Sequence, residues 1–225
     1  MRDNLTDISL VLDRSGSMDS VKMDTIGGFN EFLKAQKAAP GEAAMTLAQF
    51  DHEYEIVHNG INIQDVPKLT EESFVPRGQT ALLDAIGRTI NATGARLAAL
   101  PEDKRPSKVI FVILTDGEEN NSTEFTSARV KAMIQQQTEV YNWDFVFLGA
   151  NQDAMYTGAA MGIHANNSMS YEADRAGTTH AFRSVSDNMR SYREGAQGMK
   201  THFFSDADRE KQKKSGADSK KKRTK

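Results

Sequence analysis

Oxygen-bearing side chains gather in three short segments of this 225-residue chain. In the first, Asp13-Arg14-Ser15-Gly16-Ser17, hydroxyls follow a carboxylate at alternate positions. The second segment offers the hydroxyl of Thr80, and the third offers the carboxylate of Asp116. Oxygen ligands of this kind suit a hard divalent cation, Mg²⁺ first and Mn²⁺ as an alternative. Because only two of the ligands carry charge, the ion would keep its attraction for an oxygen atom from outside.

The elements that position these segments follow from the hydrophobic pattern. Strand-like segments are 8–13, 44–50, 54–63, 109–114, 145–148 and a weak one near Ile163. Helical spacing covers a segment that contains Ile26 and Leu33 and ends at Pro40, and then 81–99, 124–140, 153–161 and 173–198. The last helix is polar and weakly amphipathic, so we expect it to dock weakly, as elements that move on ligand binding do.

Strands that alternate with helices predict an α/β fold, a doubly wound and mostly parallel sheet of six strands with helices on both faces. The connection between 44–50 and 54–63 is so short that the second of these strands must be an antiparallel edge strand. With the strand order 3-2-1-4-5-6, the first and fourth strands are neighbours, and the loops that leave their carboxyl ends open a crevice. Asp13 and Asp116 stand at these two ends.

These residues resemble a known site. Asp13-x-Ser15-x-Ser17, then Thr80, then Asp116 is similar to the metal-ion-dependent adhesion site of von Willebrand factor A domains, over about residues 5–200. The resemblance implies a Rossmann-like fold with Mg²⁺ at the carboxyl edge of the sheet. It implies that Ser15 and Ser17 bind the ion directly, Asp13 and Asp116 mainly through waters, and Thr80 directly in the ligand-bound form. It also suggests a cytoplasmic prokaryotic or phage member of the family.

The resemblance implies a non-catalytic module that binds an unidentified partner protein, whose Asp or Glu carboxylate completes the metal shell. Two other functions stay open: a Mg²⁺-dependent hydrolase that uses Asp13, and a self-associating scaffold or virion component. Against the hydrolase, no His or Lys is spaced to join the cluster as a general base. Taken singly, Asp13 and Asp116 could be turn formers and Thr80 a helix N-cap, whereas Glu118 and Glu119 are expected in a solvated loop.

Composition sets further bounds. The chain has no cysteine, which excludes disulfides and thiol chemistry, and its five histidines show no zinc-site spacing. No apolar run is long enough to span a membrane and no signal peptide is evident, so we expect a cytoplasmic location without membrane contact.

Charge is divided unevenly along the chain. Residues 206–225 hold nine Lys or Arg and four acids, so this end carries +5 and the remainder −8. We therefore expect two parts, a domain at 1–200 and a basic, disordered tail at 201–225. The acidic body argues against broad nucleic-acid binding, and any such contact is expected from the tail alone.

Overall fold

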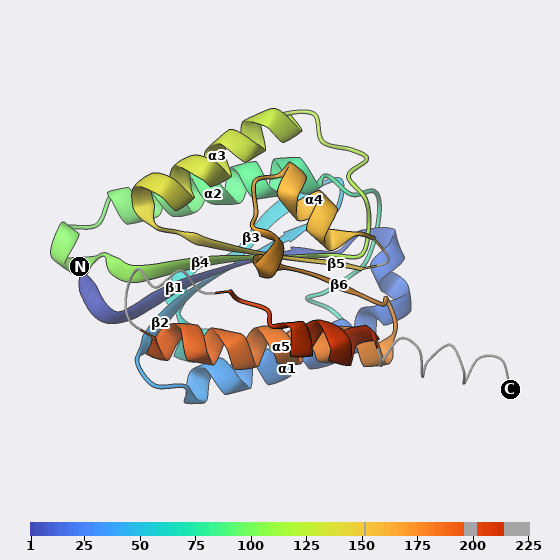
Figure 1. The fold of residues 1–225 in the computed structure, drawn as a ribbon, viewed down its shortest axis with the longest axis horizontal. Helices are drawn as coiled ribbons and strands as arrows, with labels where there is room; N and C mark the ends of the chain where they lie inside the picture. The colour runs from blue at the N-terminus through green and yellow to red at the C-terminus, as the bar shows by residue number, and fades with distance from the viewer. Residues whose placement is uncertain (151, 196–201, 214–225) are drawn as a thin grey trace, which may run out of the picture.

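The computed structural model describes residues 1–150, 152–195 and 202–213. Their six strands form one sheet in the spatial order β3-β2-β1-β4-β5-β6 (Figure 1). The strands are β1 (Arg2–Asp13), β2 (Glu42–Phe50), β3 (Tyr54–Asn62), β4 (Pro106–Thr115), β5 (Asp144–Ala150) and β6 (Ser168–Tyr171). Only the pair β2 and β3 is antiparallel in this sheet. The predicted fold class, strand order and antiparallel edge strand are confirmed.

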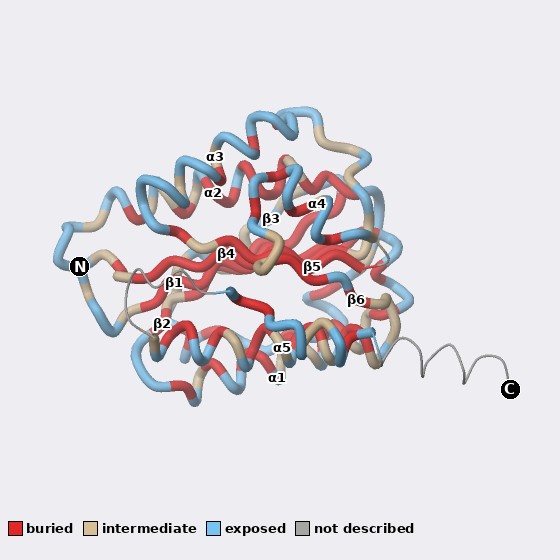
Figure 2. The backbone as a smooth tube through the Cα atoms, in the orientation of Figure 1, coloured by how far each residue is buried: buried red, intermediate tan, exposed pale blue. Residues whose placement is uncertain are grey.

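Helices cover both faces of the sheet. They are α1 (Lys22–Ala38), α2 (Leu82–Ala98), α3 (Ser127–Tyr141), α4 (Ala154–Ala160) and α5 (Arg175–Glu194). Figure 1 shows α1 and α5 below the sheet and α2, α3 and α4 above it. Each layer buries apolar side chains against its own face, so the molecule has two hydrophobic cores separated by the sheet (Figure 2).

Residues 109–114 of the central strand β4 form a continuous apolar run, and the two cores explain why. Ile110, Val112 and Leu114 belong to the core between the sheet and helices α1 and α5. Phe111 and Ile113, which alternate with them, belong to the core between the sheet and helices α2 and α3. Both faces of this run pack in a hydrophobic core, so its side chains are apolar on both faces, and this burial fixes the position of the strand's carboxyl end.

The antiparallel edge strand brings one more segment to the functional side of the sheet. The turn at 51–53 joins β2 to β3, so it lies at the edge where β1 and β4 also end. Along β3 the register with β2 shifts twice. Gly60, near these shifts, has a φ of +66°, and the Arg96 guanidinium packs where a side chain would begin. The outer strand is therefore bulged and partly covered.

Two predicted elements need correction. The last strand is not at Ile163 but at Ser168–Tyr171, and Ile163 is a buried residue of the turn after α4. Four residues with only two apolar positions are too short to give a periodic signal. The last helix begins at Arg175, where Asp174 accepts a hydrogen bond from the Gly177 amide at 2.8 Å. It ends at Glu194, and residues 196–198 of the predicted helix lie outside the described residues.

Helix α5 is docked more firmly than its polar sequence suggests. Phe182, Val185 and Met189 are buried in the core shared with α1. At the end of the helix the ammonium of Lys108 donates to the carbonyls of Tyr192, at 3.0 Å, Arg193 and Gly195. The contacts of this helix therefore do not support the expected weak docking.

The folded unit also continues beyond the predicted boundary at residue 200. Phe203 and Phe204 are buried in the core on the α1 and α5 side, and residues 206–213 are helical. The amide of Phe204 donates to the carbonyl of Asn166 at 2.8 Å, and the Arg209 guanidinium donates to that of Ala165 at 3.0 Å. The folded unit therefore includes 202–213, and the predicted boundary at 200 is too early. The sequence shows no sign of this, because two adjacent phenylalanines produce no periodic signal. The predicted disorder of 214–225 falls outside the described residues.

Across residues 1–150, 152–195 and 202–213, no helix combines the length and the apolar character that crossing a bilayer requires.

Candidate metal centre

The site begins with a buried carboxylate at the end of β1. Asp13 is fully buried. One of its oxygens, Oδ1, accepts the backbone amide of Ser15 at 2.6 Å, and the other, Oδ2, accepts the hydroxyl of Thr115 at 2.5 Å. Thr115 is the last residue of the neighbouring strand β4. The two strand ends are thus joined through one carboxylate, which is held from both sides.

The two serines continue the chain of oxygens outward. Ser15 Oγ and Ser17 Oγ lie 3.1 Å apart, and the Ser17 hydroxyl donates to Asp116 Oδ1 at 2.6 Å. Since Ser17 gives its only hydroxyl proton to Asp116, Ser15 is the donor in the first contact. Asp13 and Ser15 are buried whereas Ser17 is exposed, so the row of oxygens opens toward solvent. The structure therefore brings four of the five predicted residues into one cluster.

Thr80 reaches the same place from the loop before α2. A Cβ added to Gly117 would stand 2.9 Å from Thr80 Oγ1, so the hydroxyl lies directly against the residue after Asp116. The backbone of Thr80 is held by Asn120, whose side-chain oxygen accepts the Thr80 amide at 2.9 Å and whose amide donates back at 3.1 Å. Any side chain at position 117 would crowd this hydroxyl, and the fifth predicted residue thus lies at the edge of the cluster.

Thr80 is not the helix cap that its position suggests. The residue before α2 is Ala81, which has no capping side chain. Instead Glu119 accepts the Leu83 amide at 2.9 Å, and Ser122 Oγ accepts the Asp84 amide at 3.0 Å. Glu119 is therefore a structural residue of the loop after β4 rather than a solvated one. The Thr80 side chain is left available to the cluster.

The electrostatics of the cluster favour a cation. Burial raises the pKa of Asp13 to about 6 and also raises the pKa of Asp116. None of the ion pairs formed by the described residues involves either carboxylate. A buried and a partly buried carboxylate that share no cationic side chain stay costly to ionise until positive charge arrives from outside. A bound cation would supply that positive charge.

The donor set fits one class of ion. Within the part of the chain that the structure describes, no group of three or more His, Cys, Asp or Glu residues could hold a metal. The candidate centre instead combines two carboxylates with three hydroxyls, and a set of oxygens alone suits Mg²⁺ or Mn²⁺ rather than zinc. The residues that fit the ion are Asp13, Ser15, Ser17, Thr80 and Asp116.

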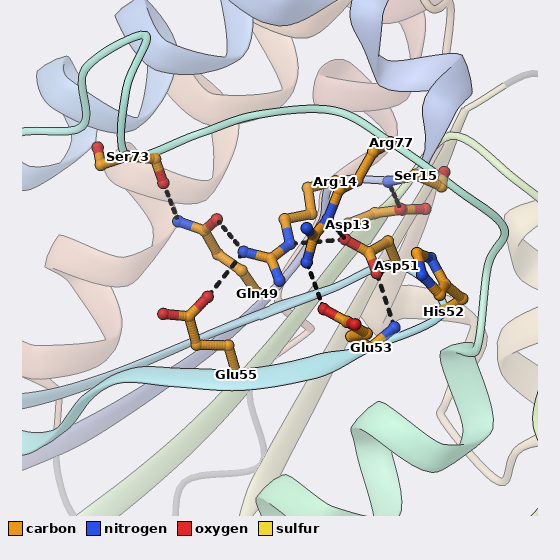
Figure 3. A network of polar contacts seen from close by, with 10 residues as sticks. All are labelled: Asp13, Arg14, Ser15, Gln49, Asp51, His52, Glu53, Glu55, Ser73 and Arg77. Atoms are coloured by element: carbon orange, nitrogen blue, oxygen red, sulfur yellow. Dashed lines mark hydrogen bonds and ion pairs between the residues drawn. The ribbon is translucent and has the colours of Figure 1, made fainter.

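Sequence reasoning missed the residues that surround this centre from the β2–β3 turn. Asp51 in that turn is fully buried and binds Arg14 and Arg77, which flank the predicted ligands (Figure 3). His52 packs against Gly78, where an added Cβ would stand 2.0 Å from its Nδ1. A histidine thus lies beside the Thr80 loop although its spacing in the sequence gave no sign of it. The only available signal was an Asp at the end of a strand, which is common.

Comparison with known proteins bears on the fold. No protein-family model and no curated protein sequence matches the chain. Among solved structures, proximal thread matrix protein 1 from the mussel byssus matches 81% of this chain and 47% of its own, at 15% identity and a TM-score of 0.58. A von Willebrand factor type A structure from Catenulispora acidiphila matches 82% of this chain and 42% of its own, at 15% identity and a TM-score of 0.52.

A third structure, the manganese-loaded TRAP protein of Plasmodium vivax, matches 81% of this chain and 73% of its own, at 14% identity and a TM-score of 0.50. The chain spans about half the length of the mussel and Catenulispora proteins. These matches agree with the observed sheet order. The chain has the Rossmann-like fold of von Willebrand factor A domains.

Proposed function

We propose that this chain is a protein-binding module that recognises an acidic side chain of a partner through a bound divalent cation, Mg²⁺ in the first place. The ligands from this chain are Asp13, Ser15, Ser17, Thr80 and Asp116. One observation carries the proposal: the 2.6 Å hydrogen bond from Ser17 to Asp116 brings together oxygens that are 99 residues apart in the sequence. No catalytic residue is assigned.

The chain's own residues explain why the ion would attract a carboxylate. The ion supplies two positive charges, and only Asp13 and Asp116 carry negative charge toward it. The three hydroxyls are neutral, so the ion's charge is spread over few anionic ligands and keeps its attraction for another. Attraction between charges is stronger in a partly desolvated crevice than in bulk water. The acidic body of the chain repels free anions and favours a partner whose surface is shaped to fit.

Two of the known structures support the proposal that this chain binds a divalent cation. One of the mussel byssus structures is described with a zinc-occupied metal-ion-dependent adhesion motif, and the Plasmodium vivax protein is described as manganese-loaded. Both descriptions concern proteins that share the fold with this chain. Together with the donor set, they favour a divalent cation here, and the oxygen-only ligands favour Mg²⁺ or Mn²⁺ over zinc.

Titration calorimetry tests the metal. We expect Mg²⁺ and Mn²⁺ to bind the wild-type protein, and we expect the double change Ser15→Ala, Ser17→Ala to weaken binding by at least about tenfold. Ser191→Ala is the matched control, because this exposed serine lies on α5, away from the cluster. A wild-type protein that binds neither ion at millimolar concentration would end the proposal.

Affinity capture tests the partner. We also propose that the chain acts in the cytoplasm of bacteria or of phage-infected cells. The wild-type chain and the double serine variant are therefore each incubated with bacterial lysate or phage-infected lysate in Mg²⁺ or EDTA. We expect proteins that bind the wild type in Mg²⁺ and are lost both in EDTA and with the variant. Binding that survives both changes would show that the partner does not use the ion. Light scattering in Mg²⁺ separately tests self-association.

A further inference from the structure

The β2–β3 turn contains a buried carboxylate that has no place in the proposed ligand set. Asp51 is fully buried. Its Oδ2 accepts Arg14 Nε at 2.9 Å and Arg77 Nε at 3.0 Å, and its Oδ1 accepts the Glu53 amide at 2.6 Å (Figure 3). Burial opposes ionisation of Asp51, but the hydrogen bonds from Glu53 and the two arginines outweigh it and hold the pKa below its ordinary value. The group is thus a buried anion between two cations.

The two arginines belong to the two loops that supply hydroxyls to the candidate metal centre. Arg14 stands between Asp13 and Ser15, but Figure 3 shows its side chain pointing to β2 and β3. Arg77 lies three residues before Thr80, and its side chain reaches Asp51 beside that of Arg14 in Figure 3. Asp51 therefore joins the serine loop and the threonine loop through one carboxylate oxygen.

Backbone hydrogen bonds run through the same junction. The Arg14 amide donates to Phe50 O at 2.7 Å, and the Ala81 amide donates to Asp51 O at 2.9 Å. The loops also bind each other directly, since the Arg77 amide donates to Arg14 O at 2.8 Å and the Gly16 amide donates to Gly78 O at 3.1 Å. The turn is thus bonded to both loops by backbone and by side chains.

The far ends of both arginines are fixed as well. Arg14 Nη1 donates to Glu55 Oε2 at 2.8 Å, and Arg77 Nη2 donates to Glu53 Oε2 at 2.5 Å. Both glutamates follow Asp51 on the turn and on β3. A guanidinium bound at two points by carboxylates has its position and its orientation set, which a single contact would not achieve. The β2–β3 turn and the start of β3 therefore hold each loop through its arginine.

We infer that Asp51 is a positioning residue of the metal centre: by holding Arg14 and Arg77, it sets the distance between the Ser15–Ser17 pair and Thr80. This inference rests on the proposed metal-binding function. Asp51 touches no proposed ligand atom. Its effect on the ion passes through the loop backbone, in the way that groups behind a metal's own ligands commonly tune affinity.

The decisive variant is Asp51→Asn, which keeps the shape and an oxygen for the Glu53 amide but removes the charge. Asp7→Asn is the matched control. Asp7 is also a buried Asp paired with an arginine, Arg96 at 2.9 Å, but it lies near the other end of β1. Titration calorimetry with Mg²⁺ should show affinity lower by about tenfold in Asp51→Asn and within about twofold of wild type in Asp7→Asn. Equal affinity in both variants would overturn the inference.

A second measurement needs no metal. Hydrogen exchange of the metal-free protein should be faster at the amides of Gly16 and Ala81 in Asp51→Asn, and unchanged there in Asp7→Asn. If wild-type protein binds no ion, the proposed function fails, while these two amides still report whether Asp51 holds the loops together. Exchange at wild-type rates in Asp51→Asn would overturn the inference by itself.

A milder pair of variants covers the case in which Asp51→Asn does not fold. The Arg77 side chain is about half exposed, so its replacement costs less. Arg77→Gln should lower Mg²⁺ affinity and speed exchange at Ala81, and Arg77→Lys should restore part of both, because it keeps the charge but not the two-point contact. Wild-type affinity and exchange in Arg77→Gln would contradict the inference.

Discussion

The candidate metal centre at the carboxyl end of the sheet and the Arg193 site at its amino end satisfy their charged groups with different partners. At the carboxyl end, Asp13 and Asp116 are met by the hydroxyls of Thr115 and Ser17. At the amino end, the Arg193 guanidinium binds the carbonyls of Gln36 at 2.6 Å, Pro40 at 3.2 Å and Gly41 at 3.0 Å. The Asp13 and Asp116 carboxylates thus have hydroxyl groups, which can rotate, among their partners, whereas the Arg193 guanidinium is surrounded by fixed backbone dipoles.

This difference separates the candidate metal centre from a structural clamp. The carbonyls around Arg193 and Lys108 lie at the C-terminal ends of α1 and α5, where helix dipoles favour positive charge. These carbonyls belong to the backbone and cannot rotate away. A hydroxyl can instead turn its oxygen toward an incoming ion. Burial of charge alone therefore does not indicate function, and the kind of partner does.

The largest expected effect belongs to the amino end. Lys108→Met leaves three carbonyls at the end of α5 without their donor and should lower the free energy of unfolding by about 3 kcal/mol. Denaturant unfolding measures the loss, and titration calorimetry should show Mg²⁺ affinity unchanged. Lys104→Met, at an exposed lysine, is the control and should match wild type in both. A clear loss of metal affinity in Lys108→Met would break the separation between the two ends.

The reverse pattern is expected at the carboxyl end. Asp13→Asn removes one of two charged ligands and should weaken Mg²⁺ binding about a hundredfold, which corresponds to about 2.7 kcal/mol. The same change should stabilise the metal-free protein at pH 7.5 by about 1 to 2 kcal/mol, because burial raises the pKa of Asp13 to about 6 and its ionisation is costly. Calorimetry and denaturant unfolding measure the two effects. A destabilised metal-free variant would make Asp13 a structural residue.

The pH dependence of stability sharpens this point. An acid whose pKa is about 6 when folded and about 3.9 when unfolded binds more protons in the folded state between those values. Its contribution to stability is therefore complete below pH 3.9 and is lost as the pH rises through 6. Without metal, the wild type should lose about 2 to 3 kcal/mol relative to Asp13→Asn between pH 4 and pH 7. A constant difference across this range would contradict the assigned burial cost.

In saturating Mg²⁺ the sign should reverse. The ion binds the ionised carboxylate, so metal binding and protonation of Asp13 compete. Metal-dependent stabilisation of the wild type should shrink as the pH falls below 6, which unfolding curves with and without Mg²⁺ will measure. Stabilisation that stays constant down to pH 4.5 would place the ion elsewhere.

The smallest effect is expected at Thr80, which enters the cluster at its edge. Thr80→Val keeps the shape but removes the hydroxyl, and it should weaken Mg²⁺ binding by about 1 kcal/mol. Once a partner is identified, its binding should weaken more than that, because the proposal uses this hydroxyl when the partner's carboxylate is bound. Thr80→Ser retains the oxygen and should stay close to wild type. Equal losses in both variants would point to packing against Gly117 instead.

The same contrast explains what the sequence could predict. The candidate centre was predictable because Asp13, Ser15 and Ser17 are close in sequence, and because topology places Asp116 beside them. The role of Asp51 was not, since its partners are 37 and 26 residues away and meet only once the loops are built. The clamps of the amino end have backbone carbonyls as partners, and every residue has one. A pattern of side chains in the sequence therefore cannot predict these clamps.

The shifted register of β3 has a consequence for how copies of this chain meet. A straight outer strand offers a row of free amides and carbonyls onto which another chain can add. Here the double shift, the positive φ of Gly60 and the overlying Arg96 interrupt that row, and at the opposite edge β6 spans only Ser168–Tyr171. Neither margin is a good template for strand addition, which protects the protein from aggregating through its sheet while the candidate metal centre stays open.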